Sequence, residues 1–193
     1  MILLLQYELS FDSFHSKQDS ILKVGSHDLK SGEFQSHSPM PLSLTLKNDF
    51  PEVKHVVGVW QIIREESKIT INNNDYSGFK GASVEPDFFS IFDYKLIQGS
   101  HDNLLRNPNE IYISENLARK VFGKEDPVGN KITLQQFDFS IAGIFADVPE
   151  NSEVSFDVLL SDKIREIVWS DFPIAWWSGG MHTYVILNEN VSV

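Results

Sequence analysis

The stretch that decides the fold is SENLARKVFGKEDPVGNKI, residues 114–132. Ser114 is of a residue type that caps helix N-termini, and apolar residues follow it at helical spacing, namely Leu117, Ala118, Val121 and Phe122. Gly123 is placed to end the helix in a left-handed turn, and Pro127 prevents the helix from resuming. The chain then turns into a strand that begins near Lys131. We therefore predict a short amphipathic helix that leads into a β-hairpin.

Charge excludes some classes of partner. The 193 residues include 27 acidic and 16 basic side chains, which gives a net charge of −11. Nucleic-acid binding needs a basic surface, and an anionic membrane repels an acidic protein, so both are disfavoured as partners. The chain has no cysteine, which excludes disulfides, thiolate metal sites and cysteine nucleophiles.

Strand and helix signals alternate in the first third of the chain. A strand is predicted over 20–25, and Pro39-Met40-Pro41 opens a helix with the apolar residues Leu42, Leu44, Leu46 and Phe50. Residues 53–64 contain a second, strongly β-favouring run. This order predicts a βαβ crossover in which the two strands are parallel and the helix covers one face of the sheet.

The middle of the chain is richer in strand signals. We predict strands over 68–71 and 79–84 with a polar hairpin turn at 72–75, and a short helical turn after Pro86. Further strands are predicted over 110–113, 132–134, 137–145, 155–160 and 183–187. The fold class is therefore α+β, and the predicted core is Phe79, Phe89, Phe92, Ile113, Leu117, Val121, Phe122, Phe139, Ile141 and Phe145.

Motifs for catalysis and cofactor binding are not found in the sequence. It contains neither the phosphate-binding pattern G-x-x-x-x-G-K-[ST] nor the serine-hydrolase pattern G-x-S-x-G, and its six histidines have no metal-ligand spacing. The carboxylates Asp87, Asp93, Glu125 and Asp126 could pair in a cleft, but caps and solvated loops explain them equally well. We expect no catalytic residues, cofactor or metal, and we expect that the protein is not an enzyme.

One aromatic cluster is the candidate contact surface. Its residues are Trp169, Phe172, Ile174, Trp176 and Trp177, in a stretch interrupted by proline and glycine. Aromatic side chains on a loop can anchor a partner. They can also cap one end of a β-rich core, and we favour that interpretation because tryptophan is usually well buried.

The N-terminus admits two interpretations. Residues 1–5, MILLL, are apolar but far too few to cross a bilayer, which takes about 20 residues. They belong either to a core helix or to the end of a longer apolar helix.

Several segments together resemble the extracytoplasmic core domain of MacB/FtsX-type ABC-transporter permeases. Besides residues 114–132, the resemblance includes the passage from Pro41 to Val53, the phenylalanine-rich turn VEPDFFSIFDYKLIQG at 84–99, DVPENS at 147–152 and TYVIL at 183–187. These segments follow one another in the family's order, so the resemblance extends over most of the chain. It also favours the second interpretation of the N-terminus.

The resemblance implies a division into two parts. Residues 1–60 and 181–193 would form a membrane-proximal part that contains the βαβ unit, with residues 1–15 as the end of a transmembrane helix. Residues 61–180 would form an inserted β-rich part. The membrane-proximal part is expected to be incomplete, because the family continues into another helix and strand after the position of Val193.

The resemblance also implies a function. It predicts a non-catalytic domain on the periplasmic side of the bacterial inner membrane, which couples the ATP-driven motion of a separate subunit to export or release of a substrate. The implied partners are the cytoplasmic ATPase subunit, a second permease copy or paralogue, and a periplasmic adaptor or lipoprotein, with no nucleic acid. The alternative is a free-standing secreted binding module for a peptide, lipid or glycan.

Overall fold

The computed structural model describes residues 15–27, 32–102, 104–149, 152–168, 170–171, 173–189 and 191. The predicted end of a transmembrane helix, residues 1–15, lies outside this set apart from His15. Within the described ranges, no helix has the length and apolar character needed to cross a membrane.

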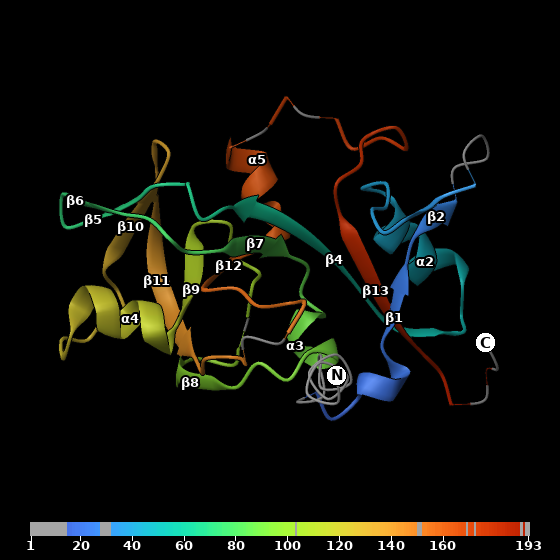
Figure 1. Ribbon diagram of the computed structural model, residues 1–193, viewed down its shortest axis with the longest axis horizontal. Helices are drawn as coiled ribbons and strands as arrows, with labels where there is room; N and C mark the ends of the chain where they lie inside the picture. The colour runs from blue at the N-terminus through green and yellow to red at the C-terminus, as the bar shows by residue number, and fades with distance from the viewer. Residues whose placement is uncertain are drawn as a thin grey trace, which may run out of the picture.

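Strands dominate the architecture (Figure 1). The helical elements are η1 (Gln18–Ser20), α2 (Leu42–Asp49), α3 (Phe88–Ile91), α4 (Glu115–Phe122), η2 (Asp162–Ile164) and α5 (Arg165–Val168). The strands are β1 (Leu22–Val24), β2 (Ser26–His27), β3 (Phe34–Gln35), β4 (Val53–Ile63), β5 (Ile69–Ile71), β6 (Asn74–Tyr76), β7 (Gly81–Val84), β8 (Leu96–Gly99), β9 (Glu110–Ser114), β10 (Lys131–Leu134), β11 (Phe137–Phe145), β12 (Val158–Ser161) and β13 (His182–Leu187). This mixture confirms the predicted α+β class.

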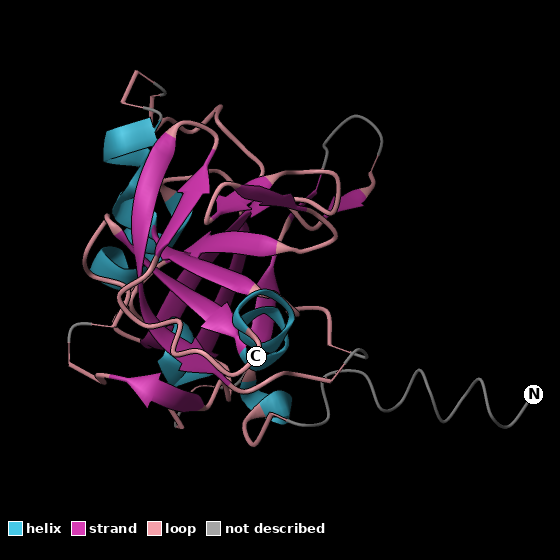
Figure 2. Cartoon of the chain, turned by 90° about the vertical axis from the view of Figure 1, so that its left-hand side faces the viewer, coloured by secondary structure: helices cyan, strands magenta, loops and turns pink. Residues whose placement is uncertain are grey.

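One mixed sheet connects most of the strands. Its order is β1-β13-β4-β7-β12-β9-β11-β10-β5-β6, and β8 pairs with β11. The long strand β4 runs diagonally between the two ends of the molecule (Figure 1), and the strands fan across the structure when it is viewed from the α4 side (Figure 2). The predicted boundary near Trp60 falls within β4, and the division into two parts stays a prediction.

The βαβ unit is present with one strand added. Both β1 and β4 pair antiparallel with β13, which lies between them, so β1 and β4 are parallel in direction but are not neighbours. The predicted helix forms as α2, in which Ser43 is the buried residue while Leu44 is 62% exposed. Leu42, Leu44 and Leu46 are two residues apart, and a spacing of two places side chains on opposite sides of a helix.

The two predicted hairpins differ in outcome. The β10–β11 hairpin is confirmed, with Gln135 at a positive φ in its turn. The first hairpin joins β5 to β6 and not to the predicted strand at 79–84. Within that range, Gly81–Val84 form β7, which pairs with β4 and β12. Asn72 and Asn73 have φ of 49° and 63°. Two consecutive residues with positive φ make a two-residue turn, so pairing begins at once with Asn74.

Apolar clusters cover both faces of the sheet. Along β9, Ile111 and Ile113 belong to the cluster under α4, whereas Tyr112 belongs to the cluster with α3. Of the predicted core residues, Phe79, Phe92, Ile113, Leu117, Phe122, Phe139, Ile141 and Phe145 are buried, whereas Phe89 and Val121 are half-buried.

The helix predicted from residues 114–132 forms as α4. The Ser114 hydroxyl accepts a hydrogen bond from Leu117 N–H at 3.1 Å, which makes it the expected N-cap. Gly123 follows the helix at φ 61°, and its N–H donates to Arg119 O at 3.0 Å. Capping at both ends therefore fixes the length of α4.

Candidate functional site

The aromatic cluster contains a hydrogen-bonded turn, Ala175–Ser178, which we call the aromatic turn. Ser178 N–H donates to Ala175 O at 2.9 Å, and the Ser178 hydroxyl donates to the same oxygen at 2.6 Å while it accepts from Ala175 N–H at 3.0 Å. Trp176 and Trp177 occupy the two central positions and are 58% and 76% exposed. Both tryptophans therefore project into solvent, and the favoured interpretation that they cap the core is wrong.

The base of the aromatic turn is held by the segment before α2. Met40 N–H donates to Ser178 O at 2.9 Å, and Ser38 N–H donates to Met181 O at 2.8 Å. Ser178 itself is only 2% exposed. These bonds hold the base of the turn and keep its tip at a defined position, which lowers the entropic cost of binding through that tip.

The other predicted contact residues are placed only in part. Ile174, beside the turn, is 60% exposed. Trp169 and Phe172 lie outside the described residues. The structure therefore brings Ile174, Trp176 and Trp177 together on one segment.

The aromatic turn lies at one end of β13. It precedes His182, the first residue of that strand, whereas η1 and the start of β1 lie at the other end, since Leu22 pairs with Val185 and Val24 with Thr183. In Figure 1 the segment before β13 is accordingly at the top and η1 at the bottom. The turn is therefore remote from the side at which the chain enters β1.

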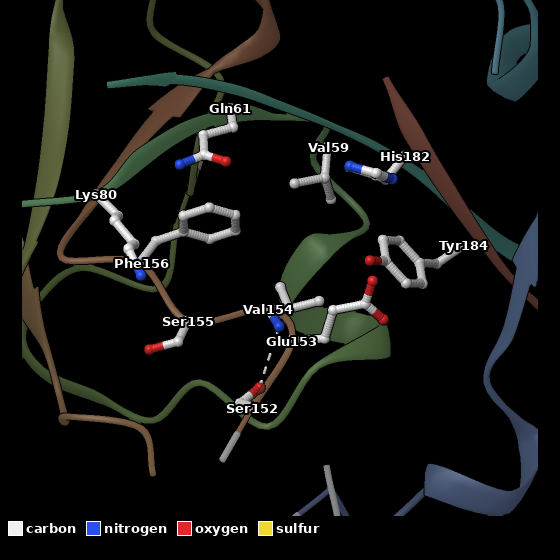
Figure 3. A pocket seen from close by; sticks show the side chains of 10 residues that line it. All are labelled: Val59, Gln61, Lys80, Ser152, Glu153, Val154, Ser155, Phe156, His182 and Tyr184. Atoms are coloured by element: carbon white, nitrogen blue, oxygen red, sulfur yellow. Dashed lines mark hydrogen bonds between the residues drawn. The ribbon is translucent and has the colours of Figure 1, made fainter. Parts of the chain in front are cut away.

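A cavity of about 530 Å³ lies between β4, β13 and the segment 152–156 (Figure 3). The side chains of Gln61 and Phe156 point into it. Its charged groups already have partners, because Lys80 Nζ lies 3.1 Å from Glu65 Oε1 and Glu153 forms an ion pair with Lys23. Such a cavity can accommodate a small ligand group that has both polar and apolar atoms.

His182 at the rim of this cavity is held as a neutral donor. Burial and the nearby charge of Lys23 lower the pKa of its imidazole. Its Nδ1 lies 3.1 Å from Ser36 O, and because a carbonyl oxygen only accepts, Nδ1 carries the proton. The ring also packs against His37 with centroids 4.6 Å apart. These contacts fix the ring in the wall of the cavity.

The sequence profile of the MacB-like periplasmic core domain matches residues 1–193. The chain belongs to this family. It is thus an extracytoplasmic domain of a MacB-like ABC-transporter permease, and the family is not a known enzyme class. This membership favours the transporter domain over the free-standing secreted module.

Solved structures agree with this assignment of the core domain. A domain assigned to a permease protein of Porphyromonas gingivalis is 26% identical, with a TM-score of 0.77 over 92% of this chain and 79% of that one. The periplasmic region of MacB from Actinobacillus actinomycetemcomitans is 13% identical, with a TM-score of 0.68 over 93% and 81%. The extracellular domain of the noncanonic ABC-type transporter YknZ from Gram-positive bacteria is 13% identical, with a TM-score of 0.62 over 88% and 83%. No curated protein sequence matches the chain significantly.

The four candidate carboxylates of this core domain do not converge. Asp87 lies near Lys47 and His55, and Asp93 accepts a hydrogen bond from Ser16 N–H. Asp126 accepts from Val128 N–H at 2.9 Å within its own loop, and the neighbouring Glu125 is exposed. Among the described residues, no group of three or more histidine, aspartate or glutamate side chains could hold a metal ion.

The sequence analysis missed one carboxylate, Glu85. It follows β7 directly and accepts hydrogen bonds from Ser43 and from the backbone of Gly58. Burial, as the largest influence, raises the pKa of its carboxyl group. A glutamate between the apolar end of a strand and Pro86 was the available signal, because proline ends the strand and the glutamate side chain can then accept from an N–H of the neighbouring strand.

Proposed function

We propose that this domain transmits the ATP-driven motion of a separate cytoplasmic subunit to a substrate or partner outside the bacterial inner membrane. The motion would arrive through the membrane part of the permease, which would act with a second permease copy or paralogue. The domain would perform no chemistry itself.

The observation that carries this proposal is the shared strand β4. Val53 to Val59 of β4 pair with β13, and Val59 to Ile63 pair with β7, so one strand belongs to both ends of the sheet. Backbone hydrogen bonds in a continuous sheet resist shear better than a linker does. A displacement applied at β1 and β13 would therefore reach the β-rich end with little loss.

The aromatic turn is the proposed contact with a partner, together with Trp169 and Phe172 from the same stretch. Two exposed tryptophans on a fixed turn are typical of residues that dominate binding energy at protein interfaces. The turn lies away from the end at which the chain enters β1, which supports a partner such as a periplasmic adaptor or lipoprotein over the permease's own bilayer.

The test replaces both exposed tryptophans, Trp176→Ala with Trp177→Ala, in the intact permease reconstituted with its ATPase subunit. We expect transport to fall at least about tenfold, because two interface anchors are lost, while ATP turnover and the melting temperature stay near wild type. Leu44→Ala, which removes another exposed apolar side chain on α2, is the matched control. Wild-type transport by the double variant would contradict the contact role of the turn.

A further inference from the structure

A half-buried carboxylate, that of Glu85, lies where β4 changes its partner strand. β7 ends at Val84, and Pro86, which has no N–H, leads the chain away into α3. Glu85 N–H still donates to Gly58 O at 3.3 Å, and the Glu85 side chain then replaces the missing backbone acceptor, since Gly58 N–H donates to its Oε2 at 2.8 Å. The carboxylate thus completes the pairing of β4 at this position.

The other carboxylate oxygen holds helix α2. The Ser43 hydroxyl donates to Glu85 Oε1 at 2.6 Å, and Ser43 is the buried residue of α2. The remaining polar contact from this helix to α3, Lys47 Nζ to Asp87 Oδ2, is 3.4 Å long and exposed, and such ion pairs contribute little. Polar contact with one carboxylate therefore adds to the attachment that the half-buried Leu42 and Leu46 give to α2.

Gly58 has no side chain at the point of closest approach. A Cβ there would lie 2.1 Å from Met181 Cε and 3.3 Å from Glu85 Oε1. The absence of a side chain lets the carboxylate and Met181 approach β4 from either side. Three segments distant in sequence consequently meet at one position.

Several charged groups face Glu85. Asp162 in η2 disfavours its ionised form and Arg165 in α5 favours it, while Lys47 and Asp87 line the same small cavity and His55 lies near Asp87. Burial raises the pKa of Asp162 as well. The site therefore holds two carboxyl groups that are more easily protonated than exposed ones.

We propose that Glu85 is a clamp that makes α2 move as one body with the β4–β7 junction. The clamp survives protonation, because Oε2 can still accept from Gly58 N–H while a proton on Oε1 is donated to the Ser43 oxygen. The role of the clamp in transmitting motion rests on the proposed function, whereas its hydrogen bonds from Ser43 and Gly58 do not.

The direction of the pH effect follows from linkage. The pKa of Glu85 is higher in the folded domain than in the unfolded chain. Its stabilising contribution is therefore complete below the unfolded value and is lost as pH rises through the folded value. The two hydrogen bonds of the clamp lower the pKa of Glu85 and so favour its ionised form, and the stability gained on acidification comes from relief of the burial of the charge.

The test is hydrogen exchange of the α2 amides, residues 42–49, in the intact permease. We expect exchange at least about tenfold faster in Glu85→Ala and in Ser43→Ala, because each loses the part-buried hydrogen bond between Ser43 and Glu85. Glu85→Gln should stay close to wild type, since its oxygen can accept from Gly58 while its amide group donates to Ser43. Asn48→Ala, at an exposed α2 position, is the control.

Two outcomes are decisive. Unchanged α2 exchange in Ser43→Ala, a variant that removes only one hydroxyl, would overturn the clamp. Faster α2 exchange with unchanged transport would support the clamp and contradict the proposed function.

Discussion

At the scale of single residues, Ser114 connects the start of α4 to the neighbouring strand. Its hydroxyl accepts from Leu117 N–H and donates to Asp157 Oδ1, both at 3.1 Å, and the residue is 2% exposed. Ser114→Ala should lower the free energy of unfolding by about 1–2 kcal/mol, because it removes a helix cap and a part-buried hydrogen bond to the Asp157 carboxylate. Urea unfolding measures this loss. Ser140→Ala, on an exposed strand position, should change stability by less than about 0.5 kcal/mol.

Other individual residues show where sequence reasoning reaches its limit. Burial of Phe139 and Ile141 followed from strict alternation along one strand, and the structure confirms it. The role of Glu85 could not be predicted, because its two donors come from residues 27 and 42 positions away. Exposure of Trp176 and Trp177 contradicted the usual burial of tryptophan, since a local turn and not the core determines their position.

At the scale of elements, local signals succeeded where neighbouring residues determine the structure. The cap and positive-φ glycine of α4 are such signals, and so is the polar turn between β10 and β11. The pairing of β7 with β4 and β12 depends on strands distant in sequence, so no local pattern could predict it. Helix α2 also forms as predicted, but its leucines at spacing two do not share one face, so Leu44 is exposed.

Helix α4 is the element whose packing would keep the β-rich end of the sheet rigid. Leu117 and Phe122 are buried against the sheet. Val121, which was also predicted as a core residue, is half-buried. Phe122 therefore carries more of the packing than Val121. Truncation of Phe122 should cost about 3 kcal/mol or more through lost burial and a residual cavity.

At the scale of the whole molecule, the chain should neither bind nor hydrolyse ATP. Its sequence lacks a phosphate-binding loop, so the nucleotide site is expected on the separate ATPase subunit. The melting temperature of the isolated domain should be the same with and without millimolar ATP. A ligand at 100 times its dissociation constant stabilises a protein by about 2.7 kcal/mol, so a nucleotide-dependent rise of several degrees would contradict the prediction.

The central claim is that ATP hydrolysis and transport are coupled through a rigid extracytoplasmic domain. The most direct measurement is the number of substrate molecules transported per ATP hydrolysed by the reconstituted permease, in the wild type, Phe122→Ala and the exposed control Asn116→Ala. We predict a markedly lower ratio in Phe122→Ala, with ATP turnover retained at least in part and with Asn116→Ala like the wild type. An unchanged ratio in a Phe122→Ala domain that hydrogen exchange shows to be loosened would contradict the claim.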